Sequence, residues 1–106
     1  MVEKTYEDIK IIKQYALENK VPIMVDDSID FIISKINQKR IKKVLEIGTA
    51  IGYSAIMMAL SSPNVTVTSI EKDKDRYLEA VKNIKKFNFN KDVNNKRCSN
   101  VKLHLT

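Results

Sequence analysis

Both glycines of the chain, Gly48 and Gly52, fall within one window of five residues. Average composition would give about seven glycines in a chain of this length, scattered among turns. Glycine at a strand-to-helix turn permits a left-handed backbone and lets a ligand touch the main chain. The free N–H groups at the start of the next helix also point at the end of the strand. The two glycines therefore predict a small-molecule pocket.

An acidic residue follows at the distance that such a pocket would require. In open parallel sheets, an acid about 20 residues beyond the glycine turn can bind ribose hydroxyls at the end of the second strand. Glu71 lies roughly that far beyond Gly48 and ends a β-branched segment. The segment Glu46-Ile-Gly48-Thr-Ala-Ile-Gly52-Tyr-Ser54 lacks the G-x-G-x-x-G spacing of a dinucleotide site, which makes NAD-type binding the weaker reading.

Two helices are expected ahead of this turn. Thr5 opens a capping-box-like sequence, and apolar residues at helical spacing predict a helix over residues 5–19. Pro22 ends it, because proline pushes its predecessor out of the helical region. Asp26, Asp27 and Ser28 are candidate N-caps of a second helix that presents an isoleucine face and ends near residues 39–40.

The remainder alternates between strand and helix patterns. The apolar run at residues 43–48 predicts a strand buried on both faces. A helix over residues 54–60, a strand over 65–70 and a helix from Asp73 to about residue 88 follow, and residues 101–105 alternate like a third strand. We therefore predict an α/β fold, in which two leading helices precede a β-α-β-α-β unit with a small, right-handed parallel sheet.

The composition is that of one globular domain over residues 1–106, with 43% hydrophobic and 30% charged residues. The longest apolar stretch, residues 55–60, is far shorter than the roughly 20 residues that cross a bilayer. The N-terminus shows no secretory signal, and Cys98, the only cysteine, cannot close an internal disulfide. These features predict a cytoplasmic protein with no membrane segment and no metal site.

Half of the net charge of +6 lies in a polar tail at residues 89–106, which holds Lys91, Lys96, Arg97 and Lys102 against Asp92. Such a basic segment could attract a nucleic acid. Because no aromatic residues interleave with these charges, a solvated surface is the alternative.

The sequence Val44-Leu-Glu-Ile-Gly-Thr-Ala-Ile-Gly-Tyr-Ser54 resembles motif I of the class I S-adenosylmethionine-dependent methyltransferases. Val67-Thr-Ser-Ile-Glu71 resembles the second motif of that family. The Gly-Thr-x-x-Gly-Tyr-Ser form and the preceding residues 16–24 are more similar to the O-methyltransferase branch. This branch includes catechol and caffeoyl-coenzyme A enzymes and bacterial methyltransferases of hydroxyuridine in tRNA. The resemblance covers residues of about 10–88 and implies a Rossmann-like fold with S-adenosylmethionine as cofactor.

The resemblance also implies a set of cofactor-binding residues. Glu46 would orient the glycine turn, and Glu71 would accept both ribose hydroxyls. Other residues would line the methionine moiety, close the turn, border the adenine or touch the sulfonium end: Gly48, Thr49, Ala50, Gly52, Tyr53, Ser54, Lys72 and Met24.

Simpler structural roles stay open for the same residues. Glu46 could be a buried acid satisfied by local N–H groups, and Glu71 a solvated strand end. Tyr53 could pack in the core while Ser54 caps a helix, and Met24 could fill the core.

The family fold has seven strands in about 200 residues, whereas the pattern here reaches only a third strand. The resemblance places the metal-binding acids and the base near the substrate beyond that strand, so the catalytic residues stay unassigned. We therefore expect a truncated cofactor-binding half of the fold. The first strand would normally pair with a fourth, and the bare edge formed by Val44, Leu45 and Ile47 predicts a homodimer.

The leading functional hypothesis is methyl transfer from S-adenosylmethionine to a hydroxyl of a small molecule or of a tRNA nucleoside. The alternative is a non-catalytic fragment that acts only through self-association or through nucleic-acid binding by its basic tail.

Overall fold

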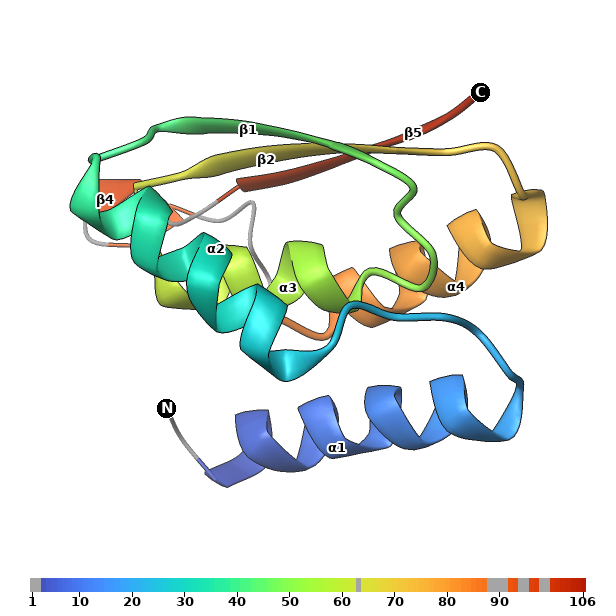
Figure 1. Cartoon of the computed structure of the whole chain (residues 1–106). Helices are drawn as coiled ribbons and strands as arrows, with labels where there is room; N and C mark the ends of the chain where they lie inside the picture. Colours follow the sequence, from blue (N-terminus) through green and yellow to red (C-terminus); the bar gives the residue numbers. More distant parts are fainter. Residues whose placement is uncertain (1–2, 63, 88–91, 94–95, 98–99) are drawn as a thin grey trace.

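In a computed structural model, the described residues form four helices and a three-stranded sheet with a small separate hairpin (Figure 1). The structure describes residues 3–62, 64–87, 92–93, 96–97 and 100–106. In chain order the elements are α1 (Glu3–Glu18), α2 (Asp26–Gln38), β1 (Lys43–Ile47), α3 (Tyr53–Ser61), β2 (Thr66–Glu71), α4 (Lys74–Lys85), β3 (Asp92–Val93), β4 (Lys96–Arg97) and β5 (Asn100–Leu105).

The main sheet has the order β1-β2-β5, and both pairings are parallel. In register, Ile47 of β1 lies beside Ile70 of β2, which in turn lies beside His104 of β5. The β-branched residues of β2 place this strand in the centre, where both of its edges are paired. The β-α-β-α-β unit predicted from the sequence is therefore confirmed, including its third strand.

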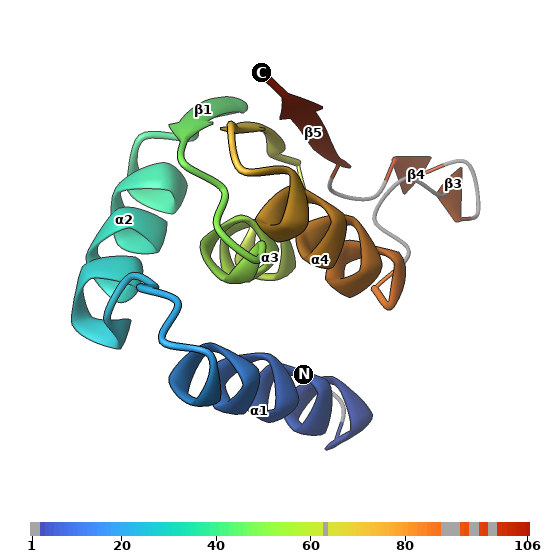
Figure 2. The same ribbon diagram turned by 90° about the vertical axis from the view of Figure 1, so that its right-hand side faces the viewer.

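All four helices lie on one side of this sheet (Figures 1 and 2). α3 and α4 follow the strands beneath the sheet, and α1 crosses below both of them. The core fills the space between these layers. It contains aliphatic residues from every layer, among them Ile12 and Ala16 of α1, Ile29 and Ile36 of α2, Ala55 and Ile56 of α3, Val67 of β2 and Val101 of β5.

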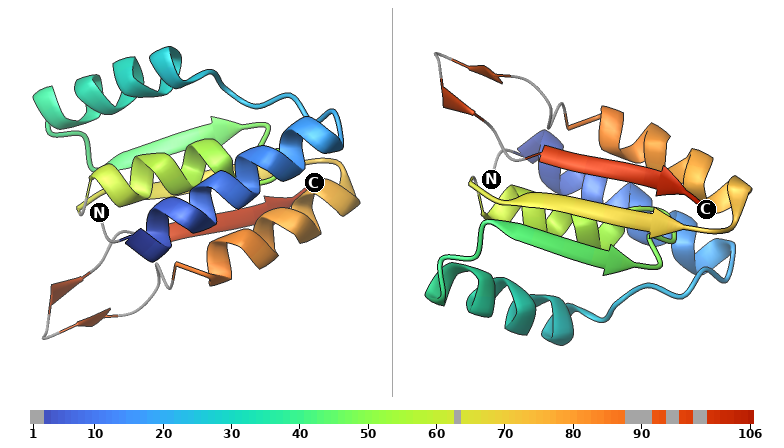
Figure 3. Two further views of the ribbon diagram at one scale, coloured as in Figure 1. Left: turned by 90° about the horizontal axis from the view of Figure 1, so that it is seen from below. Right: turned by 90° about the horizontal axis from the view of Figure 1, so that it is seen from above.

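The other side of the sheet carries no helix among the described residues, and Figure 3 shows the three strands from that side with nothing over them. The prediction that the first strand is buried on both faces is therefore wrong. Side chains alternate along β1, and Leu45 and Ile47 are 64% and 75% exposed. A continuous apolar run indicates that burial of both faces of the strand would be favourable. It does not indicate that the described part of the chain covers both faces.

Helix starts differ from the predicted ones in two places. α1 begins at Glu3, so Thr5 lies inside the helix, and α2 begins after Val25, which makes no side-chain cap. The Asp26 carboxylate is engaged elsewhere, as described below. The cap predicted for α4 is confirmed, because the Asp73 carboxylate accepts a hydrogen bond of 3.0 Å from the Arg76 backbone N–H.

A short antiparallel hairpin, β3–β4, precedes β5 and projects from the body of the molecule (Figure 3). The sequence reading treated this segment as a polar loop and missed both strands. Cys98 and Lys91 of the predicted tail lie outside the described residues. In the part of the chain that the structure describes, none of the helices has the length and apolar character needed to cross a membrane.

Two adjacent isoleucines of α1 test how much this helix contributes to the core. Ile12 is 1% exposed, whereas the neighbouring Ile11 is 56% exposed. We expect Ile12→Ala to lower the free energy of unfolding by about 2–5 kcal/mol, through lost burial and the cavity left behind. Ile11→Ala should change it by less than about 0.5 kcal/mol. Urea denaturation of both variants measures the difference, and equal effects would show that α1 is not packed on the core.

Candidate functional site

Two hollows lie on either side of the loop that joins β1 to α3, at the carboxyl ends of the strands. The larger, of about 460 Å³, is lined by Pro22, Ile47, Gly48, Ala50, Ile70, Glu71, Lys72, Arg76 and Thr106. The smaller, of about 140 Å³, is lined by Pro22, Ile23, Met24, Glu46, Ile47, Gly48, Thr49, Ala50, Tyr53 and Ser54. Because four residues belong to both linings, the hollows form adjoining parts of one candidate site.

The loop between them has an unusual backbone. Gly48 and Gly52 both have φ of +92°, and Ala50 between them has φ of +50°. Left-handed conformations are strained for residues other than glycine and need support from their surroundings. A Cβ at Gly52 would also lie 3.4 Å from the Cβ of Ala80 on α4, whereas a Cβ at Gly48 would point into open space. Gly52 thus permits close packing, and Gly48 leaves the pocket wall open.

The carboxylate of Glu71 holds this strained loop against the end of β2. Its Oε1 accepts a hydrogen bond of 2.7 Å from the Ala50 backbone N–H. Its Oε2 accepts from the N–H groups of Lys72 and Asp73, at 3.1 and 2.9 Å. Glu71 is only 6% exposed, so the alternative of a solvated strand end is wrong. A carboxylate has about four acceptor positions, and three are filled here.

A second acid, the half-buried Glu46, joins β1, β2 and α3. Its Oε1 accepts a hydrogen bond of 2.6 Å from the Ser69 hydroxyl, and its Oε2 accepts one from the Ser54 hydroxyl. Ser69 also shares a 2.7 Å hydrogen bond with the hydroxyl of Thr49 in the loop. Burial raises the pKa of the Glu46 carboxyl, although the two hydroxyl donors oppose the rise. Its partners are hydroxyls rather than the local N–H groups that the alternative reading expected.

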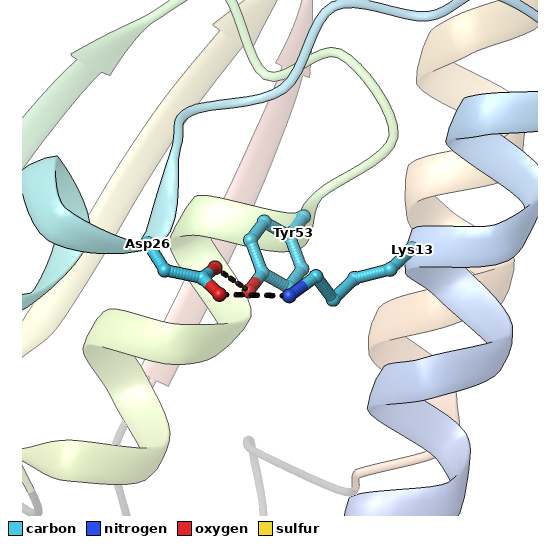
Figure 4. Close-up of polar contacts among 3 residues, drawn as sticks. All are labelled: Lys13, Asp26 and Tyr53. Atoms are coloured by element: carbon cyan, nitrogen blue, oxygen red, sulfur yellow. Dashed lines mark hydrogen bonds and ion pairs between the residues drawn. The ribbon is translucent and has the colours of Figure 1, made fainter.

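Tyr53, the first residue of α3, ties the site to the two leading helices (Figure 4). Its ring is buried, and its hydroxyl donates a 2.9 Å hydrogen bond to Oδ1 of Asp26. Oδ2 of Asp26 accepts a 2.9 Å ion-pair hydrogen bond from the Lys13 ammonium group. Burial and the bond to Asp26 raise the pKa of Tyr53, and the bond from Lys13 lowers the pKa of Asp26. The interpretation of Tyr53 as a packing residue is therefore correct for its ring, and its hydroxyl additionally bonds Asp26.

The structure brings the predicted cofactor residues together in these hollows. Gly52 alone lies behind the pocket walls, against α4. Ser54 does not cap α3, because Gly52 occupies the N-cap position and Ser54 donates to Glu46. Sequence reasoning missed Ser69, Asp26 and Lys13, since each acts through a partner distant in sequence. Among the described residues, no three side chains of the His, Cys, Asp or Glu types gather as a metal site.

A family model described as O-methyltransferase matches residues 4–104 of the chain. Among curated proteins, a tRNA1(Val) (adenine(37)-N6)-methyltransferase from Pseudoalteromonas translucida is 40% identical over 48 residues, which are 45% of this chain and 21% of that protein.

Solved structures resemble most of the chain. A protein from Staphylococcus aureus with a provisional assignment as a caffeoyl-CoA O-methyltransferase superposes with a TM-score of 0.73 at 32% identity, covering 90% of this chain and 43% of that one. The O-methyltransferase from Bacillus cereus, solved in complex with SAH, gives 0.69 at 21% identity, covering 92% and 43%. The chain thus spans less than half the length of the solved proteins it matches.

The environment of Glu46 predicts a pH dependence of stability. Its pKa is raised in the folded state, so the folded protein holds the proton more strongly than the unfolded chain does. The free energy of unfolding should therefore fall as the pH rises from the ordinary glutamate value of about 4.3 through the raised value. We expect Glu46→Gln to remove this fall, because an amide carries no titrating charge and can still bond both hydroxyls.

Chemical denaturation of both proteins across that pH range measures the effect. Glu7→Gln on the exposed face of α1 corrects for the loss of one negative charge. An identical pH dependence in the wild-type protein and in Glu46→Gln would contradict the assigned role.

Proposed function

Because the chain belongs to the O-methyltransferase family, we propose that it forms the cofactor-binding part of an S-adenosylmethionine-dependent O-methyltransferase. Support comes from the match over residues 4–104 and from the two adjoining hollows at the carboxyl ends of β1 and β2. Ligands of open parallel sheets bind at this edge. When bound, the cofactor supplies an electrophilic methyl group on a sulfonium. Its presence as SAH in the Bacillus cereus structure and as SAM in an O-methyltransferase from Streptomyces achromogenes agrees with this proposal.

Glu71 is the observation that carries the proposal. A buried carboxylate at the end of β2 faces the larger hollow and keeps about one acceptor position unfilled on Oε1. A ribose offers two neighbouring hydroxyl donors to such a group. Binding both of them requires one backbone N–H to share its acceptor or to shift. Glu71 would thus bind the ribose and hold the loop with the same carboxylate.

The other lining residues suit the remaining parts of the cofactor. Lys72 and Ile70 border the larger hollow, where the adenine would lie beside the ribose. The smaller hollow suits the methionine moiety, because Glu46 and Ser54 offer polar groups there and the half-buried Met24 also lines it. Gly48, Thr49 and Ala50 form the wall between the two parts, where the cofactor would cross.

Glu71→Gln tests the ribose assignment. A lost charge-assisted hydrogen bond is worth roughly 1.5–3 kcal/mol, so the affinity for S-adenosylhomocysteine should fall about 10- to 100-fold. Isothermal titration of the wild-type chain and the variant measures it, with circular dichroism to confirm that both are folded. Asp75→Asn, an exposed acid in the first turn of α4, is the matched control and should bind like the wild-type chain.

Two results would contradict the proposal. Unchanged affinity in Glu71→Gln would remove Glu71 from the site. No heat from the wild-type chain at millimolar ligand would overturn cofactor binding itself.

The methyl acceptor is a hydroxyl group in this proposal, by the family's description. The charge of +6 and the similarity to a tRNA-modifying enzyme favour a tRNA nucleoside, and a small hydroxylated molecule is the other class. The described residues offer no base that we assign to the acceptor, so the catalytic residues stay unassigned. A cytoplasmic location belongs to the same proposal, supported by the single cysteine.

A second candidate function, self-association, is favoured by the uncovered sheet. Within the described residues, the outer edge of β1 pairs with no further strand. Leu45 and Ile47 place exposed apolar side chains beside that edge, and such edges recruit other strands. We propose that two copies associate through β1. A chain that associates in this way without binding cofactor would be a non-catalytic fragment.

Leu45→Thr tests this association. Threonine keeps the strand preference but removes most of the apolar surface, so the variant should dissociate at concentrations where the wild-type chain is dimeric. Light scattering over a concentration series measures this. Leu17→Gln on α1, where the leucine is 75% exposed far from the sheet edge, should leave the association unchanged. A wild-type chain that stays monomeric at high concentration would refute the dimer.

A further inference from the structure

Three side chains from separate elements meet beside the smaller hollow. Only one of them, Tyr53, belongs to the predicted cofactor-binding residues. Figure 4 shows Lys13 reaching from α1, Asp26 from the start of α2 and Tyr53 from the start of α3. Both oxygens of Asp26 are engaged, one by the Tyr53 hydroxyl and one by the Lys13 ammonium, at 2.9 Å each. The ammonium nitrogen also lies 5.8 Å from the centre of the Tyr53 ring. Lys13, Asp26 and Tyr53 are called the clasp below.

The clasp fixes one end of a segment that lines the hollow, and a backbone hydrogen bond fixes the other. Residues 22–24, which contribute to the pocket wall, connect α1 to α2. The Val21 N–H bonds the Ala16 carbonyl at 2.9 Å and secures the segment at its start. Asp26 secures it at its end, because its carboxylate is bound to α1 through Lys13. The wall that carries Met24 is thus held in place from both sides.

The same carboxylate fixes the opposite wall. Tyr53 follows Gly52, the last left-handed residue of the loop, and lines the smaller hollow. Its hydroxyl bond to Asp26 therefore sets the distance between the loop side of the pocket and the residues 22–24 side. Without Asp26, each wall would keep its own packing but lose its direct link to the other.

Stability alone gives a weak account of this arrangement. The side chains of Lys13 and Asp26 are 39% and 61% exposed, and ion pairs at such positions contribute little to folding. Tyr53 is buried through its ring irrespective of the bond made by its hydroxyl. Two weak contacts to one carboxylate can position the pocket walls, because small displacements at a binding site have large effects on affinity.

We propose that the clasp is a positioning device that holds the methionine end of the cofactor site closed, which makes α1 part of the binding machinery. This inference rests on the proposed cofactor binding. Lys13 and Asp26 act through Tyr53 and the residues 22–24 segment, and are positioning residues rather than ligands. A rigid wall before binding lowers the ordering cost that the ligand would otherwise meet.

The test compares affinity with stability in the full chain. Lys13→Met, Asp26→Ala and Tyr53→Phe should each weaken S-adenosylhomocysteine binding about 5- to 10-fold in isothermal titration, with thermal midpoints close to the wild-type value. The double variant Asp26→Ala/Tyr53→Phe should bind S-adenosylhomocysteine no more weakly than the weaker-binding single variant, because both substitutions remove the same linkage. Lys13→Arg should restore the affinity, since arginine keeps the charge and the donors.

Lys82→Met provides the matched control. It removes the 3.9 Å ion pair with Glu79 on α4, which is remote from the smaller hollow, and should bind like the wild-type chain. Binding by the wild-type chain with all clasp variants within twofold of it would overturn the clasp alone. Loss of affinity in the Lys82→Met control would also overturn it. No binding by the wild-type chain would overturn the proposed cofactor site and the clasp together.

Discussion

The loop between β1 and α3 depends on one buried carboxylate. Glu71 bonds the N–H of Ala50, the left-handed residue in the middle of the loop, and the N–H groups that follow β2. It can do so only because β1 and β2 are parallel and in register, which brings the ends of both strands to the same edge. The bond holds the loop against the end of β2, and the two hollows lie on either side of the loop in that position.

The surrounding polar groups are likewise bonded to residues that are distant in the sequence. The half-buried Glu46 on β1 would be an isolated acid without the hydroxyls of Ser69 and Ser54, which come from β2 and α3. Asp26 and Tyr53 connect the leading helices to the loop in a similar way. Each side of the candidate site is therefore fixed by a hydrogen bond between elements. The aliphatic core between the sheet and the helices holds these elements in place.

The one-sided cover of the sheet gives the molecule two different faces. Helices cover the face that holds the core, and the opposite face leaves the apolar side chains of Leu45 and Ile47 in contact with solvent. Ile47 also lines both hollows, so whatever covers that face would lie next to the candidate site. Cofactor binding and association through β1 are thus neighbouring properties of one region of the chain.

The two leading helices, the parallel β-α-β-α-β unit and most residues that line the candidate site could be predicted from the sequence, whereas β3 and β4 could not. These predictions follow from local features of the sequence. Apolar periodicity, proline and the Asp73 cap mark the elements, and the spacing of Gly48, Gly52 and Glu71 marks the turn and the strand end beside it. The bonding partners of Glu46 and Glu71, the contacts of Lys13 and Asp26 with Tyr53, and the exposure of Leu45 became visible only in the folded chain. Such contacts join residues far apart in the chain, and a pattern of residue types carries no information on which distant groups come within 3 Å of each other.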